Sequence, residues 1–471
     1  MDKKVLLLLI GIVALNIFFN GQFQLHYDEA YYWVWAHNLS WSYFDHPPMI
    51  AYMIRLTSWF GHQELFVRLS AIITTTITIL AIYGLAKRMF GVKVANIAVL
   101  LAIACPLIEG VFFVMTIDSP LLMFWSLTLY TFYIGVFENR AKFIYFSGVL
   151  AGCGLLSKYT AAIIFPGLFL FLLTSREYRY FLVKKEIYLA FILAMLVFSP
   201  VIFWNYQHHW VSFAYQFNHG VNTSLEINQQ SFGDYWGGSA LVAGPILFVA
   251  MLYYSFRYLV RNLINPKLAF LFWSYVFGLI FFAYFSLFKH TEANWTAPIY
   301  ISAIILLAMW LVRTNNRFVY RTSLGLIFIV IIAAKLPLLF TPSIYHNKVP
   351  GLNVFYGNKE LLNRVKPYLT KNTVLLACDY GNASRAWYYL QLDRVYVLKQ
   401  FSFANAYRYW DSSGINMTNT PIMHAVYICD SEDREADAVL HRYFKSVRLL
   451  EYATFSNVIT DNKLYIYQVS N

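Results

Sequence analysis

The polar, aromatic stretch that follows the first apolar run decides how the chain is interpreted. Residues 5–19 read VLLLLIGIVALNIFF, and residues 21–35 read GQFQLHYDEAYYWVW. Carboxylates beside a membrane are costly unless they stay hydrated or find partners, so the pair Asp28 and Glu29 marks a candidate functional site. Two lysines precede the apolar run, as in a signal peptide, but no small-residue cleavage site follows it. We therefore predict a retained first span whose N-terminus is cytoplasmic.

The composition indicates a multi-spanning membrane protein. Of 471 residues, 59% are hydrophobic, 19% are aromatic and only 13% are charged, and the mean hydropathy is +0.51. Such a chain is too apolar to cover a soluble globule with a hydrated surface. The net charge of +12 is more typical of basic cytoplasmic loops than of a nucleic-acid partner, and we expect no nucleic acid.

Further apolar segments are long enough to cross roughly 30 Å of hydrocarbon, some with tilt or help from their neighbours. These predicted spans are approximately 65–86, 92–111, 118–137, 143–157, 159–174, 187–205, 236–256, 268–288, 293–312 and 322–340. With the first run they make eleven transmembrane helices. The fold class is thus an α-helical polytopic membrane protein.

Charge predicts the topology. The predicted inner loops hold seventeen Lys and Arg against four Asp and Glu, and none of the eleven histidines lies in them. Because basic loops stay inside, an odd number of spans leaves the C-terminal part outside. We expect residues 1–340 to form a transmembrane catalytic domain and residues 341–471 an extracytoplasmic domain. In a Gram-negative cell that side is the periplasmic face of the inner membrane.

The C-terminal part has a different pattern. Strands and helices are predicted to alternate, as strand 373–378, helix 383–390, strand 425–429 and helix 432–443. This order implies a small α/β domain with some parallel pairing. No Gly-rich phosphate loop accompanies it, so a nucleotide site is not expected. Cys378 and Cys429 either form a disulfide or remain two small buried thiols.

The first outer loop combines reactive and lipid-facing features. Tyr and Trp follow Asp28 closely, and such amphipathic rings suit the headgroup level. The segment Pro47 to Phe60 has apolar residues at near-helical spacing beside Arg55, which predicts a helix lying in the interface. Membrane lipids are therefore expected partners.

Two charged residues stand at predicted outer helix ends. Asp118 precedes Ser119 and Pro120, so it is either an N-cap or a carboxylate that positions a substrate. Lys158 breaks the positive-inside pattern, and a cation there needs an anion. That anion is either a neighbouring acid or a phosphate bound from the lipid side.

The outer loop between the ninth and tenth spans holds a third polar group. Lys289 and Glu292 either pair with each other or, with His290, face the same outer cavity as Asp28. No HxH or HExxH spacing supports a transition-metal site, so we predict no metal ligands. A divalent cation bridging a carboxylate and a phosphate stays open.

Together these groups suit glycosyl transfer at the outer membrane surface. Carboxylates can take a proton from a hydroxyl, cations can stabilise a phosphate leaving group, and aromatic surface can hold a sugar or an isoprenoid. Because no nucleotide-sugar pool exists outside the cell, a lipid-phosphate-linked sugar is the natural donor. A transporter or flippase is the alternative, but such proteins keep ionisable groups near the midplane, whereas here they gather at one face.

Four motifs in order carry a family resemblance. They are Tyr27-Asp-Glu-Ala-Tyr-Tyr-Trp33, Tyr43-Phe-Asp-His-Pro-Pro-Met49, Leu155-Leu-Ser-Lys-Tyr159 and Lys289-His-Thr-Glu-Ala-Asn-Trp295. The chain resembles bacterial GT-C glycosyltransferases related to protein O-mannosyltransferases and to the lipid A aminoarabinose and galacturonic acid transferases. The resemblance implies that Asp28 is the catalytic carboxylate in an inverting transfer, that Asp118 is a second functional acid, and that Lys158 lies near the donor phosphate.

We predict the rest of the site from these motifs and from the stretch 21–68, which ends at Arg68. Glu29 joins the catalytic set, and the expected donor-phosphate contacts are Lys158, His46, Lys289 and Arg68. The expected substrate contacts are Tyr27, Asp45, His290, Glu292, Asn294 and Trp295.

The expected donor is a polyprenyl-phosphate-linked sugar, and the enzyme is expected to be a monomer. The acceptor stays open between lipid A, another lipid, a glycan and, for a protein O-mannosyltransferase-like enzyme, a protein. One position departs from the resemblance. Where related aminoarabinose transferases have a Lys before the Pro pair, this chain has His46, whose charge depends on pH. This favours galacturonic acid or a hexose as the sugar.

Overall fold

The structure is a computed structural model, and it divides into two compact units. It describes residues 1–220, 226–261, 265–314, 353–370, 373–392, 395–398, 424–430, 440–456 and 461–471, with the single positions Arg321, Gly325, Ile329 and Tyr407. The first unit comprises Met1–Phe18, His46–Met53 and Arg68–Lys335. The second comprises Phe19–Asp45, Ile54–Val67 and Leu336–Asn471. The predicted division at residue 340 stays a prediction.

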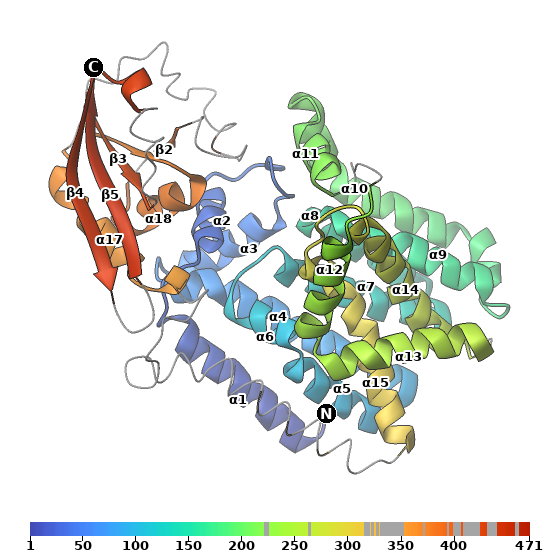
Figure 1. Cartoon of the computed structure of the whole chain (residues 1–471). Helices are drawn as coiled ribbons and strands as arrows, with labels where there is room; N and C mark the ends of the chain where they lie inside the picture. Colours follow the sequence, from blue (N-terminus) through green and yellow to red (C-terminus); the bar gives the residue numbers. More distant parts are fainter. Residues whose placement is uncertain are drawn as a thin grey trace. The chain divides into compact units, whose positions relative to one another are not determined.

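Up to Thr314 the regular elements of the described chain are all helices, joined by loops (Figure 1). In chain order its helices are α1 (Lys3–Asn20), α2 (Tyr27–His37), α3 (Met49–Thr57), η1 (Ser58–Phe60), α4 (Glu64–Phe90), α5 (Val92–Ala104), α6 (Pro106–Phe113), α7 (Asp118–Phe137), α8 (Ala141–Ser157), η2 (Tyr159–Ile163), α9 (Ile164–Thr174), η3 (Arg179–Val183), α10 (Lys185–Gln207), α11 (Val211–Gly220), α12 (Gln229–Ala243), α13 (Pro245–Arg261), α14 (Pro266–Ser286), η4 (Ala293–Ile299) and α15 (Tyr300–Thr314).

Most predicted spans correspond to helices. Among the described residues, six stretches are long and apolar enough to cross a membrane, namely α1, α4, α7, α10, α14 and η4 with α15. Shorter apolar helices occupy Ala141–Ser157 and Tyr159–Thr174, where two short spans were predicted. The predicted span 322–340 lies outside the described residues. The polytopic fold class is thus confirmed, and the number eleven stays a prediction.

Two predicted spans are broken, and the prediction of continuous helices there was wrong. α5 and α6 meet at 65°, and α12 meets the helix after it at 112°. Pro106 and Pro245 each begin the second helix of their pair. A proline lacks the N–H that would continue the preceding helix, and it forces the residue before it out of the helical region. At the sharper corner that residue is Gly244, whose φ of +89° suits a glycine.

Small residues let α8 and α10 approach each other closely. Gly148 and Gly152 lie one turn apart on α8 and pack against Ala190 and Ala194 of α10. A Cβ added at Gly148 would lie 2.1 Å from the carbonyl oxygen of Ala190. This small-xxx-small packing is a common way for helices to associate in membranes. It fixes the helix whose C-terminal end carries Lys158.

The second unit contains a mixed five-stranded sheet in the order β2-β1-β3-β5-β4. In the C-terminal part of the chain the elements of this unit are η5 (Asn353–Phe355), α17 (Asn358–Asn363), η6 (Lys366–Tyr368), β1 (Val374–Ala377), α18 (Tyr380–Leu390), β2 (Tyr396–Val397), β3 (His424–Cys429), β4 (Ser446–Ser456) and β5 (Asp461–Ser470). β1 pairs in parallel with β2 and β3, which confirms the predicted parallel pairing. β5 pairs antiparallel with β3 and β4. The predicted helix 432–443 lies largely outside the described residues.

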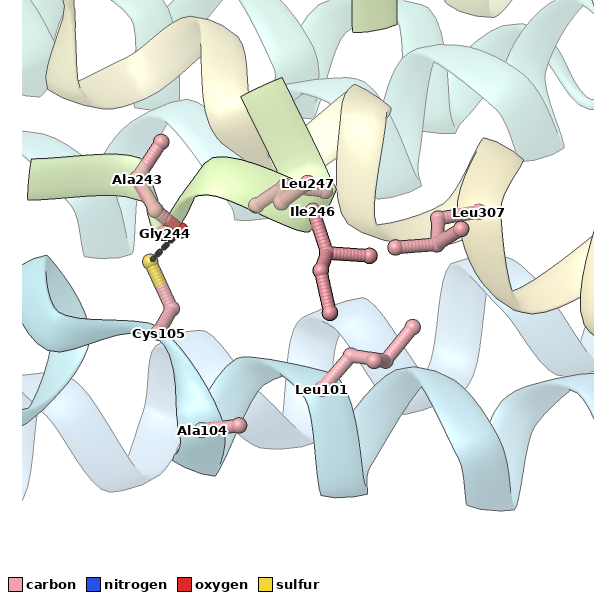
Figure 2. A pocket seen from close by; sticks show the side chains of 8 residues that line it. All are labelled: Leu101, Ala104, Cys105, Ala243, Gly244, Ile246, Leu247 and Leu307. Atoms are coloured by element: carbon pink, nitrogen blue, oxygen red, sulfur yellow. Dashed lines mark hydrogen bonds between the residues drawn. The ribbon is translucent and has the colours of Figure 1, made fainter. Parts of the chain in front are cut away.

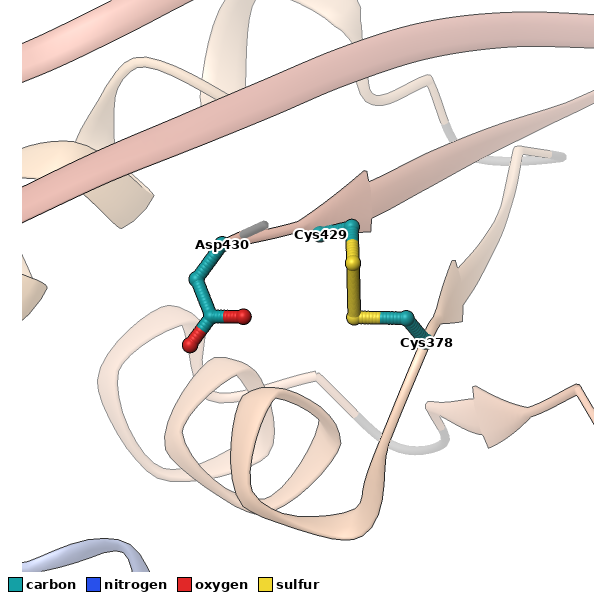
Figure 3. A group of neighbouring side chains, drawn as sticks. All are labelled: Cys378, Cys429 and Asp430. Carbon is teal, nitrogen blue, oxygen red and sulfur yellow. A yellow bond between two sulfur atoms is a disulfide. The ribbon is translucent and has the colours of Figure 1, made fainter. Parts of the chain in front are cut away.

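A disulfide resolves the two alternatives left open for the cysteines. Cys378 follows β1 and is bonded to Cys429 at the end of β3, with the two Cα atoms 5.3 Å apart (Figure 3). These cysteines and Asp430 are the only group of three potential metal ligands among the described residues. Because both sulfurs are used in the disulfide, they are not thiolate ligands.

Candidate active site

The N-terminus of α2 holds the acidic pair. The His26 side chain accepts a hydrogen bond from the backbone N–H of Asp28 at 3.2 Å, and the Glu29 carboxylate accepts one from the backbone N–H of His26 at 3.0 Å. This reciprocal capping box fixes the start of the helix. Glu29, predicted as a catalytic residue, is fully buried in this role. Asp28 beside it keeps 36% of its side chain exposed.

Asp28 receives a hydrogen bond from the C-terminal part of the chain. The Tyr380 hydroxyl donates to Asp28 Oδ1 at 3.0 Å, and His26 Nδ1 lies 3.5 Å from Asp28 Oδ2. Tyr380 is the first residue of α18, which the Asp379 side chain caps by accepting from the backbone N–H of Asn382 at 2.8 Å. Tyr380 was not among the predicted site residues, because no sequence pattern links positions so far apart.

The surroundings of Asp28 favour its protonated form more than water does. Burial raises the pKa of Asp28 to about 6, and the negative charge of Glu29 adds to this. The Tyr380 hydrogen bond and the Arg385 guanidinium act in the opposite direction. A carboxylate with a pKa near the working pH is well suited to accept a proton from a substrate hydroxyl.

Aromatic side chains enclose this acid and a second one. The Tyr31 hydroxyl donates to Asp45, and the Tyr31 ring lies 4.7 Å from the Tyr380 ring. Burial raises the pKa of Asp45 to about 7, and the negative charge of Asp28 contributes. Arg385 is buried, and its guanidinium lies 5.5 Å from the centre of the Tyr27 ring. The second unit thus brings together the predicted residues Tyr27, Asp28, Glu29 and Asp45.

The first unit brings together another part of the predicted set. Lys158 Nζ donates to Asp118 Oδ1 at 2.8 Å, and Asn294 Nδ2 donates to Asp118 Oδ2 at 3.1 Å. Both charged side chains are buried. The predicted capping role of Asp118 was wrong: α7 begins at Asp118 itself, Ile117 is the N-cap, and no side chain caps the helix. The buried lysine satisfies the carboxylate instead. Trp295 follows Asn294 in η4.

The other residues of the predicted outer loop contact nearer neighbours. His290 Nε2 lies 3.1 Å from Glu292 Oε1, and both side chains are exposed. Lys289 donates to the backbone carbonyl of Asn218. These contacts fit either a structural or a substrate-binding role, and the predicted roles of the three residues stay predictions.

Two further cations of the predicted phosphate set lie in the first unit. Arg68 is fully buried, with its guanidinium 5.3 Å from the centre of the Phe113 ring. Nδ1 of His46 lies 3.5 Å from the side-chain amide of Gln216 on α11. Their predicted contact with a donor phosphate stays a prediction.

An apolar cavity lies where the two bent helix pairs meet (Figure 2). Its lining includes Cys105 at one bend and Gly244 at the other, with Leu101, Ile246 and Leu307 around them. The Cys105 thiol points toward the backbone carbonyl of Ala243, 3.6 Å away. Apart from the Cys105 thiol the lining is aliphatic, so the cavity presents no carboxylate, imidazole or ammonium group.

The chain is similar in sequence to known glycosyltransferases. Residues 45–204 match the family described as dolichyl-phosphate-mannose-protein mannosyltransferase. The lipid A galacturonosyltransferase RgtD of Rhizobium johnstonii (strain DSM 114642 / LMG 32736 / 3841) is 28% identical over 289 residues, which are 60% of this chain. The match likewise spans 60% of the length of that relative.

Solved structures show the fold. ArnT from Cupriavidus metallidurans in the apo state aligns with a TM-score of 0.66 and 14% identity, over 98% of this chain and 97% of that one. The same protein bound to undecaprenyl phosphate aligns with a TM-score of 0.65 and 13% identity, over 99% and 98% of the two chains. The chain therefore has an ArnT-like GT-C fold, and the resemblance predicted from the four motifs is confirmed.

Proposed function

We propose that this chain is an inverting glycosyltransferase that moves a sugar from a polyprenyl-phosphate carrier to lipid A or a related glycolipid or glycan. The reaction takes place at the outer face of the bacterial inner membrane. The observation that carries the proposal is Asp28, a half-exposed carboxylate on a rigid helix start, with a pKa of about 6. The ArnT-like fold and the similarity to a lipid A galacturonosyltransferase support the substrate class.

The chemistry needs one proton acceptor and one stabilised leaving group. The acceptor hydroxyl attacks the anomeric carbon from the face opposite the phosphate, so a new C–O bond forms while the sugar–phosphate C–O bond breaks. The hydroxyl proton passes to Asp28, and the polyprenyl phosphate leaves with the bonding electron pair. A positioned general base contributes typically ~10²–10⁴-fold to such a step.

The predicted cations would act on the leaving phosphate. Positive charge near the developing phosphate charge lowers the barrier when it is held in place beforehand. Lys289, Arg68 and His46 are proposed for this role, whereas Lys158 already neutralises Asp118. We propose that the Lys158–Asp118 ion pair holds the side chain of Asn294 in place on the side of the active site where the donor binds. His46 favours galacturonic acid or a hexose over aminoarabinose as the donor sugar.

A protein O-mannosyltransferase-like activity is the second candidate, because residues 45–204 match that family. The two candidates differ in the acceptor. Mass spectrometry of lipid A, total glycolipid and glycoprotein from cells with and without the gene distinguishes them. We expect a sugar-sized mass difference on lipid A or another glycolipid. A difference confined to protein would favour the second candidate.

A transfer assay separates both enzymes from a lipid flippase. The purified chain is mixed in detergent with a polyprenyl-phosphate hexuronate or hexose and a lipid A acceptor. A flippase needs a membrane with two sides, whereas a transferase works in micelles. Absence of product for every donor, from protein that elutes as a single folded species, would refute the proposed function.

A further inference from the structure

We infer that Tyr380, a residue of the C-terminal α/β part, is a positioning residue that holds the carboxylate of Asp28 through its hydroxyl. The inference rests on the proposed function, and it makes the C-terminal part of the chain a component of the active site.

The contact is local within the second unit, where α18 packs against α2. The Tyr380 hydroxyl donates to Asp28 Oδ1 at 3.0 Å, and its ring lies 4.7 Å from that of Tyr31 and 6.1 Å from that of Tyr27. The ring is thus held between two aromatic residues of the same helix that carries Asp28. Such packing fixes the hydroxyl, and through it one of the two carboxylate oxygens.

The start of α18 is itself anchored, which gives the hydrogen bond a defined geometry. The Cys378–Cys429 disulfide ties the end of β1 to the end of β3 (Figure 3). Tyr380 comes two residues after Cys378 in the chain. Asn382 Nδ2 donates to Asp379 Oδ2 at 2.6 Å, and Asp379 caps the helix. A covalent link and a helix cap therefore set the position of the tyrosine.

The hydroxyl leaves Asp28 able to work as a base. It engages Oδ1, whereas His26 Nδ1 lies 3.5 Å from Oδ2. A single neutral donor orients the carboxylate without neutralising it, in contrast to an ion pair. The titratable and charged groups around Asp28 are His26, Tyr27 and Glu29 on its own segment, Asp45 in the first loop, and Asp379, Tyr380 and Arg385 from the C-terminal part.

The variant Tyr380→Phe removes one oxygen and keeps the ring. The matched control is Tyr389→Phe, because Tyr389 lies on the same helix and its hydroxyl accepts from the backbone N–H of Leu25 at 2.7 Å. Both variants lose a hydrogen bond between α18 and the first loop, but only Tyr380→Phe loses one to Asp28. Thermal unfolding in detergent shows that each variant is folded.

The first measurement needs no substrate. Infrared difference titration follows the carboxyl band of Asp28, identified as the band missing in Asp28→Asn. We expect the midpoint of this titration to rise by about one pH unit in Tyr380→Phe, because a hydrogen bond to the charged form of an acid is lost. In Tyr389→Phe the midpoint should stay at the wild-type value.

The second measurement is the pH dependence of sugar transfer. Well below the midpoint, Tyr380→Phe should transfer about tenfold more slowly than wild type, since tenfold less Asp28 is ionised. The two rates should approach each other toward pH 8. An unchanged infrared midpoint in Tyr380→Phe, or an equal change in both variants, would overturn the inference. If the wild-type chain transfers no sugar, the proposed function fails, and the infrared midpoint still decides the role of Tyr380.

Discussion

Two carboxylates of this protein have opposite surroundings, although the sequence placed both at outer helix ends. Asp28 at the start of α2 is half-exposed and accepts one hydrogen bond from a neutral hydroxyl, and burial raises its pKa to about 6. Asp118 at the start of α7 is buried, with one oxygen on a lysine and the other on an asparagine amide. The first is the acid that we propose as the proton acceptor, whereas the second is held in place by two side chains.

We propose that this difference separates a reactive acid, Asp28, from an anchoring acid, Asp118. A carboxylate whose two oxygens are engaged by a cation and an amide has little capacity to accept a proton from a substrate. A carboxylate that is partly desolvated and lightly hydrogen-bonded is more basic. The comparison predicts that substitutions at the two sites act on different quantities, the rate at Asp28 and the stability at Asp118 with Lys158.

The largest effect is expected for Asp28→Asn. An Asn side chain still accepts the Tyr380 hydrogen bond but cannot take up a proton, so transfer should fall at least ~10²-fold. The rate is measured in the detergent assay, with Glu360→Gln as the control, because Glu360 is an acid of the same unit that contacts Gln24 instead. Near-normal turnover by Asp28→Asn would remove Asp28 from the catalytic role. If the acceptor is a phosphate that is already ionised, the loss should be smaller.

The second effect is a loss of stability at the buried ion pair between Lys158 and Asp118. Lys158→Met leaves the buried Asp118 carboxylate without its cation, and breaking a buried pair costs about 3–5 kcal/mol of stability. The measurement is unfolding in detergent, by heat or denaturant. The double variant Asp118→Asn with Lys158→Met removes both charges and should recover much of the loss. A Lys158→Met protein as stable as wild type would show that the pair is dispensable and that Lys158 is free for a donor phosphate.

The third effect is the pH dependence of the wild-type rate. Because the base must be ionised and its pKa is about 6, transfer should decline as the pH falls through about 6 and level off above it. Profiles of kcat/KM between pH 4.5 and 8.5 give the midpoint. A rate that stays level down to pH 4.5 would mean that no group like Asp28 limits the reaction.

The smallest effect is a gain in stability. The pKa of Asp28 is higher in the folded chain than its ordinary value, so the folded state binds more protons between the two values and its stability falls as the pH rises through that range. The Asp28→Asn variant has no carboxyl group to ionise at this position, so it avoids this pH-dependent loss of stability. Its unfolding temperature should be slightly higher than that of wild type at pH 7.5, but not at pH 4. Stability and activity then change in opposite directions at Asp28, as is common for active-site residues. A lower unfolding temperature at both pH values would indicate a structural role.

Periodicity and charge predicted much of the fold. The spans around α7, α10 and α14 lie within a few residues of their predicted bounds, because long apolar runs have few alternatives. The bends at Cys105 and Gly244 were missed, although each lies directly before a proline that could have indicated it. The strands β1 and β3 and their parallel pairing were predicted, whereas the antiparallel β4 and β5 were not.

The site was predicted as a set of residue types but not as a set of contacts. The sequence determined that Asp28, Asp118, Lys158 and Asn294 are polar groups at the ends of apolar segments, because a membrane tolerates them only there or with partners. Only the tertiary structure decided which acid meets the lysine and which meets Tyr380. Those contacts join positions far apart in the chain, and the local pattern of polar and apolar residues carries no information about such pairing. The acidic pair near the start of the chain was therefore visible in the sequence, but the tyrosine that donates a hydrogen bond to Asp28 was not.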